Sequence, residues 1–348
     1  MATPVIIPVF LPHLGCPEHC IFCNQRALAP EVPLPSRVRE LIETSLHHLP
    51  ADPGRLKQVA FYGGSFTAIP EEDQIAYLKE VEPFLSSGRI DSIRISTRPD
   101  ALDEKVLFLL ARQGVKTIEV GAQSMVDEVL CLSCRGHSAD ETSAGIGRLK
   151  SLGFEAGVHL MIGLPGDSLE RFEETLNRII DLRPHFVRIH PTLVLRGAVL
   201  EQRWREGRYC PLTLAEAVQW LKRGLLRLEK ASIPVVRVGL QPTGDLEASY
   251  LSGPYHPALH QRVVSEIYFD MAARVLEPQQ AQPEIIFLCH PGEVSNVRGQ
   301  KNENIRRLKE VFALKSIMVQ GKRDIHRGRL VIKTAAGEFS IERGDLFE

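Results

Sequence analysis

The segment Val5–Gln25, VIIPVFLPHLGCPEHCIFCNQ, joins an apolar run to three closely spaced cysteines. The run Val5–Pro12 is short and rich in β-branched residues, which predicts a buried strand. The thiols of Cys16, Cys20 and Cys23 follow it directly. This order predicts a strand whose carboxyl end opens into a loop that carries three cysteines.

Five further runs of this kind alternate with segments of helical period, which is the pattern of a parallel sheet with crossover helices. The strands are expected at Gln58–Gly64, Ser92–Arg98, Thr117–Ser124, Glu155–Leu164 and Phe186–Val194. Helices are expected between them at Pro35–His47, Glu71–Phe84, Leu102–Gln113, Asp140–Leu152 and Leu169–Leu182. We therefore expect an α/β fold of about six strand–helix units.

Short motifs recur where these strands end: GGSF after the second, STRPD after the third, GAQS after the fourth and GLPG after the fifth. In parallel α/β barrels the loops after the strands converge at one end, where catalytic groups gather. Six units cannot close as an eight-stranded barrel does. We expect an open partial (β/α)6 barrel with one shared site at the carboxyl ends of its strands.

The pattern changes after Thr213, where a long amphipathic helix, Leu214–Ala231, precedes a strand IPVVRVGLQ and a turn-rich stretch, Pro242–Pro257. Beyond it we expect helices at His260–Leu276 and near Asn302–Leu314, and strands at Glu284–His290, Ser316–Gln320, Arg329–Lys333 and Phe339–Glu342. This pattern predicts the partial barrel over residues 1–245 and a smaller α+β C-terminal domain over residues 246–348.

The net charge of −1 conceals a basic segment, residues 298–333, with eleven Lys and Arg residues against three acidic ones. Such a concentration of cations is suited to a phosphate backbone, so RNA is the expected partner, although a solvated charged face is the alternative. Phe312 is the only aromatic residue in the segment, which argues against sequence-specific stacking on bases. No run approaches the ~20 apolar residues of a membrane helix, and we expect a cytoplasmic protein without a membrane partner.

The spacing Cys-x3-Cys-x2-Cys suits a four-iron, four-sulfur cluster. Three thiolates bind three irons and leave the fourth iron open to another ligand. A structural zinc site is an alternative, but it would usually require a fourth Cys or His. Seven cysteines is an odd number, which argues against a secreted disulfide framework. Buried thiols without a metal are the remaining alternative.

The triplet, with Phe22 before its last cysteine, resembles the motif of the radical S-adenosylmethionine (SAM) superfamily. A closer resemblance lies in IEVGAQSMVDEVLCLSCRGH (118–137), GLPG (163–166) and HPTLVLRGAVLEQRWREGRY (190–209). Over roughly residues 5–245 the chain resembles the radical domain of the Elongator catalytic subunit and, more distantly, the oxygen-independent coproporphyrinogen oxidases. About a hundred residues follow, and we do not expect an acetyltransferase domain of the Elongator kind in them.

The resemblance implies a cluster on Cys16, Cys20 and Cys23 whose open iron binds SAM. Electron transfer from the cluster into the sulfonium would then release a 5′-deoxyadenosyl radical. It also implies a set of cofactor contacts: Gly63 and Gly64 to the methionyl amine, Gln123 to the ribose, Arg135 to the methionyl carboxylate, and Thr97 and Arg98 lining the site. His159 is either a cofactor contact or a hydrogen-bonded core histidine. The electron donor would be a reductase, a ferredoxin or a flavodoxin.

Structural alternatives stand beside these assignments. The glycines could form a tight turn, Gln123 and Glu119 could be ordinary polar groups at a strand end, and Arg135 could lie on a surface helix. Asp167 could cap the following helix together with Ser168. The other cysteines, Cys131, Cys134, Cys210 and Cys289, could bind a second metal, but we expect buried thiols, with the first two on one helix face.

The leading hypothesis is a radical SAM enzyme that modifies an RNA base, specifically a base of tRNA. An alternative is a radical enzyme for a small anionic metabolite, such as a porphyrin-type carboxylate. A non-catalytic scaffold that carries a cluster is the third hypothesis, and the complete set of expected cofactor contacts argues against it.

Overall fold

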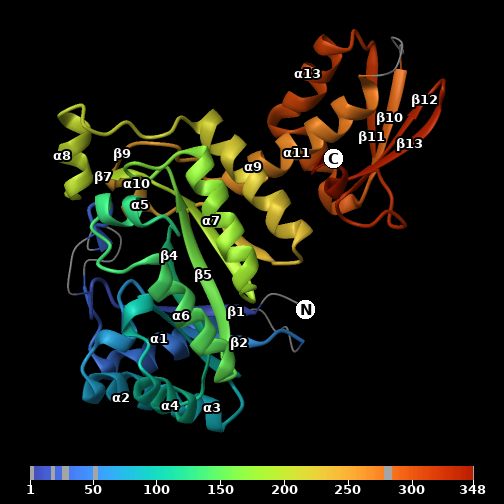
Figure 1. The fold of residues 1–348 in the computed structure, drawn as a ribbon. Coiled ribbons are helices and arrows are strands. Elements are labelled where there is room, and N and C mark those ends of the chain that lie inside the picture. Colours follow the sequence, from blue (N-terminus) through green and yellow to red (C-terminus); the bar gives the residue numbers. More distant parts are fainter. Residues whose placement is uncertain (1–3, 17–19, 26–30, 50–53, 278–283, 348) are drawn as a thin grey trace. The chain divides into compact units, whose positions relative to one another are not determined.

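The computed structural model describes residues 4–16, 20–25, 31–49, 54–277 and 284–347. It divides into two compact units. The first unit comprises Met1–Thr213 and Ile233–Tyr255, and the second comprises Leu214–Ser232 and His256–Glu348 (Figure 1). No helix among the described residues is long and apolar enough to cross a membrane.

The first unit is built on a seven-stranded parallel sheet in the order β1-β2-β3-β4-β5-β6-β8. Its strands are β1 (Val5–Phe10), β2 (Lys57–Tyr62), β3 (Ser92–Thr97), β4 (Val115–Gln123), β5 (Glu155–Ile162), β6 (Phe186–Pro191) and β8 (Val235–Val238). Each strand pairs with the next one along the chain, apart from the two-residue β7 (Val194–Leu195), which lies outside the sheet. The expected open partial barrel is confirmed, and β8 extends the six expected strands to seven.

Helices cover one face of this sheet. The unit also contains two short helices, α5 (Asp127–Leu132) and α8 (Val199–Arg205), of which α8 packs on β7. The helices that cover the sheet are α1 (Pro35–His48), α2 (Glu71–Lys79), α3 (Glu82–Ser86), α4 (Glu104–Arg112), α6 (Ala139–Ser151) and α7 (Leu169–Leu182). Apolar side chains alternate along each strand and point toward them; Phe61 of β2, for example, contacts Tyr77 of α2 edge to face at 6.0 Å between ring centroids. The other face, here the inner face, carries the polar members of the same strands.

Local sequence explains where the helices begin and end. α7 has the expected bounds, and the Ser168 hydroxyl caps it by accepting a hydrogen bond from the Arg171 amide. The single helix expected at Glu71–Phe84 is wrong, because the chain forms α2 and α3 instead. Pro83 has no amide hydrogen and is tolerated only in the first turn of a helix, so it lies near the start of α3.

The stretch expected to be turn-rich, Pro242–Pro257, contains α10 (Gly244–Ser249) and β9 (Tyr250–Ser252). β9 pairs antiparallel with β7, which ties this stretch to the first unit. The observed grouping differs from a division at residue 245 in two segments. Residues 246–255 lie in the first unit, and Leu214–Ser232 lies in the second.

The second unit has α+β character, as expected. Its sheet has the order β11-β10-β12-β13, and only the β10–β11 pair is parallel. The elements are α9 (Leu214–Lys230), α11 (Leu259–Leu276), α12 (Val294–Arg298), α13 (Glu303–Val311), β10 (Glu284–Cys289), β11 (Ser316–Gly321), β12 (Arg329–Thr334) and β13 (Gly337–Glu342). Tyr268, Phe287 and Leu330 lie in its core.

Candidate functional site

The cysteine loop packs against the turn that follows β2. The Gly63 carbonyl accepts a hydrogen bond from the His13 amide at 3.0 Å, and the Ser65 amide donates to the Leu14 carbonyl at 2.9 Å. Gly63 has φ +94°, and a Cβ atom on Gly64 would lie 2.2 Å from the Leu14 carbonyl oxygen. The two glycines therefore form a tight turn and also allow the close approach on which the cysteine loop depends.

Cys16, Cys20 and Cys23 are half-buried and form no disulfide bond. Among the described residues, no three Cys, His, Asp or Glu side chains lie together in a group that could hold a metal ion as the structure stands. Burial, followed by the neighbouring Cys20 and Cys16, raises the pKa of the Cys23 thiol to about 12, against the opposing effect of Arg135. Cationic iron would offset this repulsion between thiolates, so the donor set fits a cluster.

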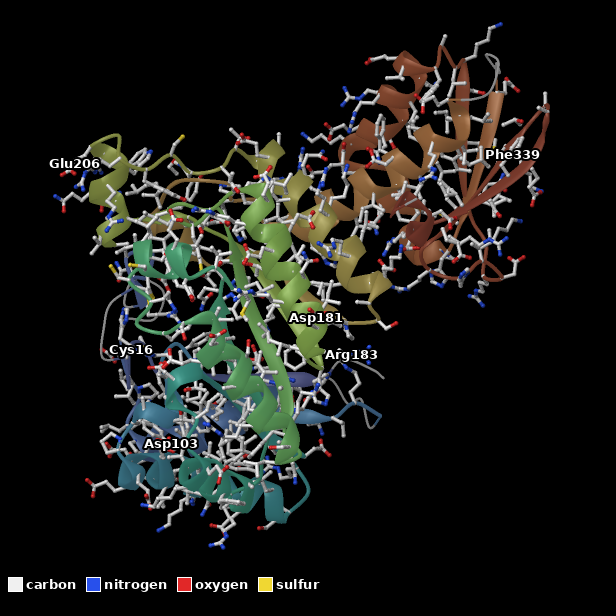
Figure 2. The ribbon with its side chains drawn as sticks, in the orientation of Figure 1. Cys16, Asp103, Asp181, Arg183, Glu206 and Phe339 are labelled. Atoms are coloured by element: carbon white, nitrogen blue, oxygen red, sulfur yellow. The ribbon has the colours of Figure 1, made fainter. Side chains whose placement is uncertain are left out.

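The loop lies at the carboxyl ends of the strands. A crossover helix runs antiparallel to the strands that it connects, so its last residue lies near the amino ends of the strands. Arg183, with φ 47°, ends α7 and therefore marks the amino ends of the strands. In Figure 2 the labelled Cys16 lies well apart from Arg183. The cysteines are thus at the end of the sheet where the strand-end motifs gather.

Arg135 connects the cysteine loop to the end of β4. Its Nη1 donates to the Cys20 sulfur at 2.9 Å, and its Nη2 donates to the Gly121 carbonyl at 2.6 Å. The alternative of a surface-helix residue is wrong, because α5 ends at Leu132 and Arg135 is half-buried in the loop that follows. Its Nε is buried and has no hydrogen-bond partner among the described residues.

Gln123 ends β4 in the left-handed region, with φ 66°. A non-glycine residue is uncommon there and often marks a functional site. The side chain is buried, and its Oε1 has no hydrogen-bond partner within the described chain. A Cβ atom on Gly121 would lie 2.9 Å from Gln123 Nε2 and 3.4 Å from Arg135 Nη2, so both side chains lie over this glycine.

The other two strand-end candidates are already engaged. The Thr97 hydroxyl lies on the helix-covered face, 2.5 Å from the Thr67 hydroxyl. Arg98 makes two hydrogen bonds to Asp100, at 2.9 and 2.6 Å. Burial lowers the pKa of Arg98, but the bond to Asp100 and the nearby charges of Asp100, Cys20 and Cys16 outweigh that effect and raise it. Arg98 therefore lies within electrostatic range of the cysteine loop.

His159 lies on the inner face, with Nε2 2.8 Å from Nδ1 of His190 on β6. The rings meet edge to face, with centroids 4.3 Å apart. Burial, followed by the charges of Arg188 and Arg135, lowers the pKa of His159 to about 3. His159 is thus a neutral, hydrogen-bonded histidine within range of Arg135.

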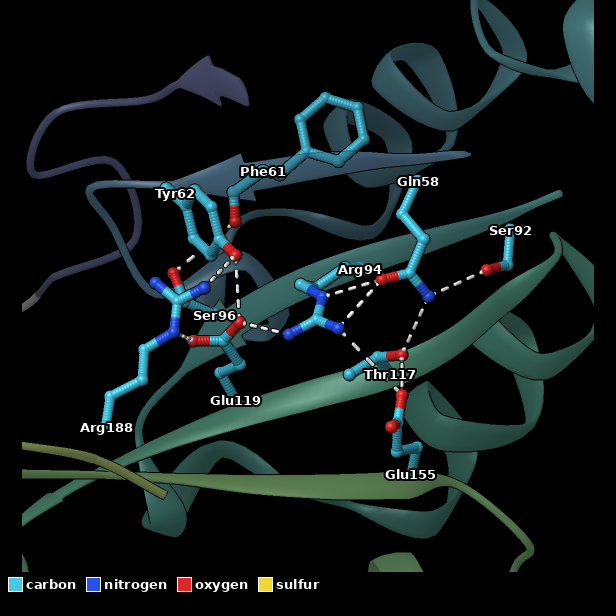
Figure 3. Close-up of polar contacts among 10 residues, drawn as sticks. All are labelled: Gln58, Phe61, Tyr62, Ser92, Arg94, Ser96, Thr117, Glu119, Glu155 and Arg188. Carbon is cyan, nitrogen blue, oxygen red and sulfur yellow. Dashed lines mark hydrogen bonds and ion pairs between the residues drawn. The ribbon is translucent and has the colours of Figure 1, made fainter. Parts of the chain in front are cut away.

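A polar network on the inner face was not predicted from the sequence (Figure 3). Glu119 accepts hydrogen bonds from Arg94 at 2.7 Å and from the Tyr62 hydroxyl at 2.8 Å, and it pairs with Arg188 at 3.0 Å. Arg94 also donates two hydrogen bonds to Gln58, at 3.0 and 2.8 Å. The signal was present in the sequence, because residues an even number of positions apart in a strand, such as Gln58 and Tyr62, point to the same face of the sheet.

Other sequence-based expectations have clear outcomes. The capping role is confirmed for Ser168 alone. Asp167 accepts from the Gly163 amide at 2.9 Å and from the Ser168 amide at 3.0 Å, so it holds the turn before α7 and does not bond to an amide of the helix. Four buried thiols is a wrong prediction, since only Cys289 is buried, whereas Cys131, Cys134 and Cys210 are exposed. Cys134 follows the end of α5 with φ 53°, so it does not share a helix face with Cys131.

Some cations of residues 298–333 have structural partners. Arg307 pairs with Glu266 at 2.7 Å and lies over the Phe269 ring at 3.7 Å, and Lys333 pairs with Glu338 at 2.8 Å. Exposed cations without an ion pair to another described residue are Arg298, Lys301, Arg306, Lys315, Lys322, Arg323 and Arg327. Several charges therefore remain available to an anionic partner.

Comparison with known proteins supports the chemistry suggested by the cysteine loop. The family model of the radical SAM superfamily matches residues 10–179, and that of the radical SAM C-terminal domain matches residues 184–268. Together they span most of the chain.

The relatives include three that are named tRNA uridine(34) acetyltransferase, and two of them are compared with this chain. The one from Methanocaldococcus infernus is 35% identical over 134 residues, covering 38% of this chain and 25% of the relative. The one from Dehalococcoides mccartyi is 26% identical over 297 residues, covering 75% and 63%. This chain thus spans less than two thirds of the length of either relative.

The solved structure of Methanocaldococcus infernus Elp3 with an N-terminal deletion shares the fold. The TM-score is 0.60 at 23% identity, covering 77% of this chain and 63% of that one. The cysteine loop, the open parallel sheet and the two family models all point to the same superfamily. The chain is an enzyme of the radical SAM superfamily.

Proposed function

We propose that the protein cleaves SAM reductively at a four-iron, four-sulfur cluster and uses the resulting radical to modify a base in tRNA. Cys16, Cys20 and Cys23 would hold the cluster, and its open iron would supply the site where SAM is reduced. The observation that carries this proposal is the position of Arg135, which joins Cys20 to Gly121 beside the unpartnered Oε1 of Gln123.

This chain's own residues divide the work of binding the cofactor. Arg135 has a planar guanidinium suited to a carboxylate, and its unpartnered Nε is a donor available to the methionyl group. Gln123 would bind the ribose through its free Oε1. Gly63 and Gly64 keep side chains away from the methionyl amine, while Arg98 contributes positive charge. Thr97, bonded to Thr67, would support the site through its backbone, and His159 would face the cofactor as a neutral imidazole.

Two observations support tRNA as the substrate. The relatives carry a tRNA uridine in their names, and exposed cations are concentrated in residues 298–333. Positive charge of this kind binds phosphates without reading sequence. The electron would come from a ferredoxin, a flavodoxin or a reductase. Unpaired cysteines suit a reducing compartment, and we place the protein in the cytoplasm.

The proposal is tested by the nucleosides of tRNA from a deletion strain. Complementation with the parent gene should restore a modified nucleoside that the deletion removes. A variant with Cys16→Ala, Cys20→Ala and Cys23→Ala should not restore it, whereas Cys210→Ala, which changes an exposed thiol outside the triplet, should. Identical tRNA nucleosides in all four strains would overturn the assignment of tRNA as the substrate.

A further inference from the structure

Two arginines lie side by side on the inner face. Arg188 of β6 and Arg237 of β8 are register partners in adjacent parallel strands, which lie about 4.8 Å apart. Register partners point to the same face, and Arg188 contacts Glu119 and Tyr62 there. Like charges directly across two strands destabilise a sheet unless something else compensates them.

The neighbouring carboxylate does not compensate both arginines. Glu119 is used by Arg94, Arg188 and the Tyr62 hydroxyl, and Arg237 donates to the neutral amide oxygen of Gln241. In the described part of the chain no carboxylate pairs with Arg237. Burial and the adjacent Arg188 lower the pKa of Arg237, as expected for a half-buried guanidinium beside another cation.

Unused hydrogen-bond donors gather at the same place. Arg188 donates a hydrogen bond from Nη2 to the Tyr62 hydroxyl, and Arg237 donates one from Nη2 to Gln241. The Arg188 Nε lies at ion-pair distance from Glu119 but makes no hydrogen bond, and Nη1 of both arginines has no hydrogen-bond partner among the described residues. His190 follows Arg188 by two positions on the same face, and its buried Nε2 also has none there. When His159 Nε2 donates to His190 Nδ1, the His190 proton is on Nε2. An anion would select this tautomer.

The surroundings limit the direction from which a ligand can approach. Phe186 precedes Arg188 by two positions, and its ring occupies the space over Gly157, where a Cβ atom would lie 2.2 Å from it. Arg94 packs on the same ring at 4.8 Å from its centroid. The free donors therefore face the side of His190 and the carboxyl ends of the strands. The Arg188 side chain is 20% exposed, so it remains within reach of solvent.

We propose that Arg188, Arg237 and His190 bind the oxyanion, a phosphate or carboxylate group, of a small-molecule substrate on the inner face. Two guanidiniums and a neutral N–H supply convergent donors for such a group. The half-buried position favours a small molecule over a backbone phosphate of RNA, for which exposed cations are present in residues 298–333. The role of the bound molecule as a substrate rests on the proposed radical reaction, but its binding can be measured without turnover.

The test uses the anaerobically reconstituted full chain and inorganic phosphate as the probe. Calorimetric titration at constant ionic strength, maintained with chloride, should show a saturable phosphate site in the parent. Arg237→Gln should weaken this site about tenfold or more, and Arg237→Lys should weaken it less because it retains the charge. The control Arg112→Gln, at the exposed end of α4, should leave it unchanged.

Loss of the like-charge neighbour gives a second readout. Without phosphate, the melting temperature of Arg237→Gln should equal or exceed that of the parent, and phosphate should stabilise only the parent. Equal phosphate affinity in the parent and Arg237→Gln would overturn the proposal. Equally weakened binding of tRNA and phosphate in Arg237→Gln would identify the occupant as RNA and overturn the small-molecule assignment. If phosphate binds as expected but tRNA nucleosides never change, the tRNA proposal fails and this site stands.

Discussion

Replacing Glu119 with Gln tests whether the inner-face network holds the half-barrel together. Glu119 is 6% exposed and pairs with Arg94, which is 5% exposed, and with Arg188. The oxygen of the new glutamine side chain would still accept a hydrogen bond from one guanidinium, but without its negative charge, which lowers the free energy of unfolding by about 1 kcal/mol. Its NH2 group would face the other guanidinium, donor against donor, which lowers the free energy of unfolding further by about 2–3 kcal/mol. We expect a total loss of about 3–4 kcal/mol, in the range for uncompensated buried charge.

The assay is native-state hydrogen exchange of peptides that cover β3 and β4. Exchange of their slowest amides should accelerate by about two to three orders of magnitude in Glu119→Gln. The matched control is Glu43→Gln, since Glu43 accepts two hydrogen bonds from Arg89, at 2.8 and 2.7 Å, but the pair is exposed. Exposed pairs contribute little, so the control should exchange like the parent. Equal rates in Glu119→Gln and the parent would refute the buried ion-pair account.

Three further predictions concern the cofactor, pH and RNA. Arg135→Ala should raise the dissociation constant for SAM roughly ten- to a hundredfold in calorimetry, and an unchanged constant would make Arg135 purely structural. Burial holds the pKa of His159 at about 3 and that of His190 well below its usual range, so the folded state excludes two protons that the unfolded chain binds. The unfolding free energy should therefore be highest above pH about 6.5, and below that pH it should fall by up to about 2.7 kcal/mol per pH unit. Urea unfolding at several pH values checks this, and the double variant His159→Gln, His190→Gln should lack the fall with pH. The double variant Arg306→Gln, Lys309→Gln should reduce the slope of log K for RNA binding against log salt concentration by about 0.7–0.9 per lost phosphate contact. Arg307→Gln should mainly lower stability, because Arg307 pairs with Glu266. An unaltered slope in the double variant would argue against this helix as an RNA surface.

The sequence predicts the parts of the fold that depend on local signals. Alternating apolar runs identify all six expected strands of the sheet, and Ser168 marks the start of α7 through its capping hydroxyl. The break between α2 and α3 is also local, because Pro83 forbids a continuous helix. The place of β8 is different, since joining the sheet beside β6 depends on pairing with residues almost fifty positions away.

The candidate site shows the same limit. The cysteine triplet and the glycines are readable because each motif is contiguous, but the contact of Arg135 with Cys20 spans 115 positions. Thr97 was expected to line the site, yet its strand parity directs its hydroxyl to Thr67. Polar residues at alternate positions of central strands predict a polar inner face. Which of these residues form pairs depends on the register between neighbouring strands.

The most direct test of the central claim is formation of 5′-deoxyadenosine from SAM. The anaerobically reconstituted parent, reduced with dithionite, should bind about four irons and release 5′-deoxyadenosine, detected by mass spectrometry. The variant with Cys16→Ala, Cys20→Ala and Cys23→Ala should lose both the cluster absorption and the product, and Cys210→Ala should retain both. Cluster and product that persist in the triple variant would contradict the account.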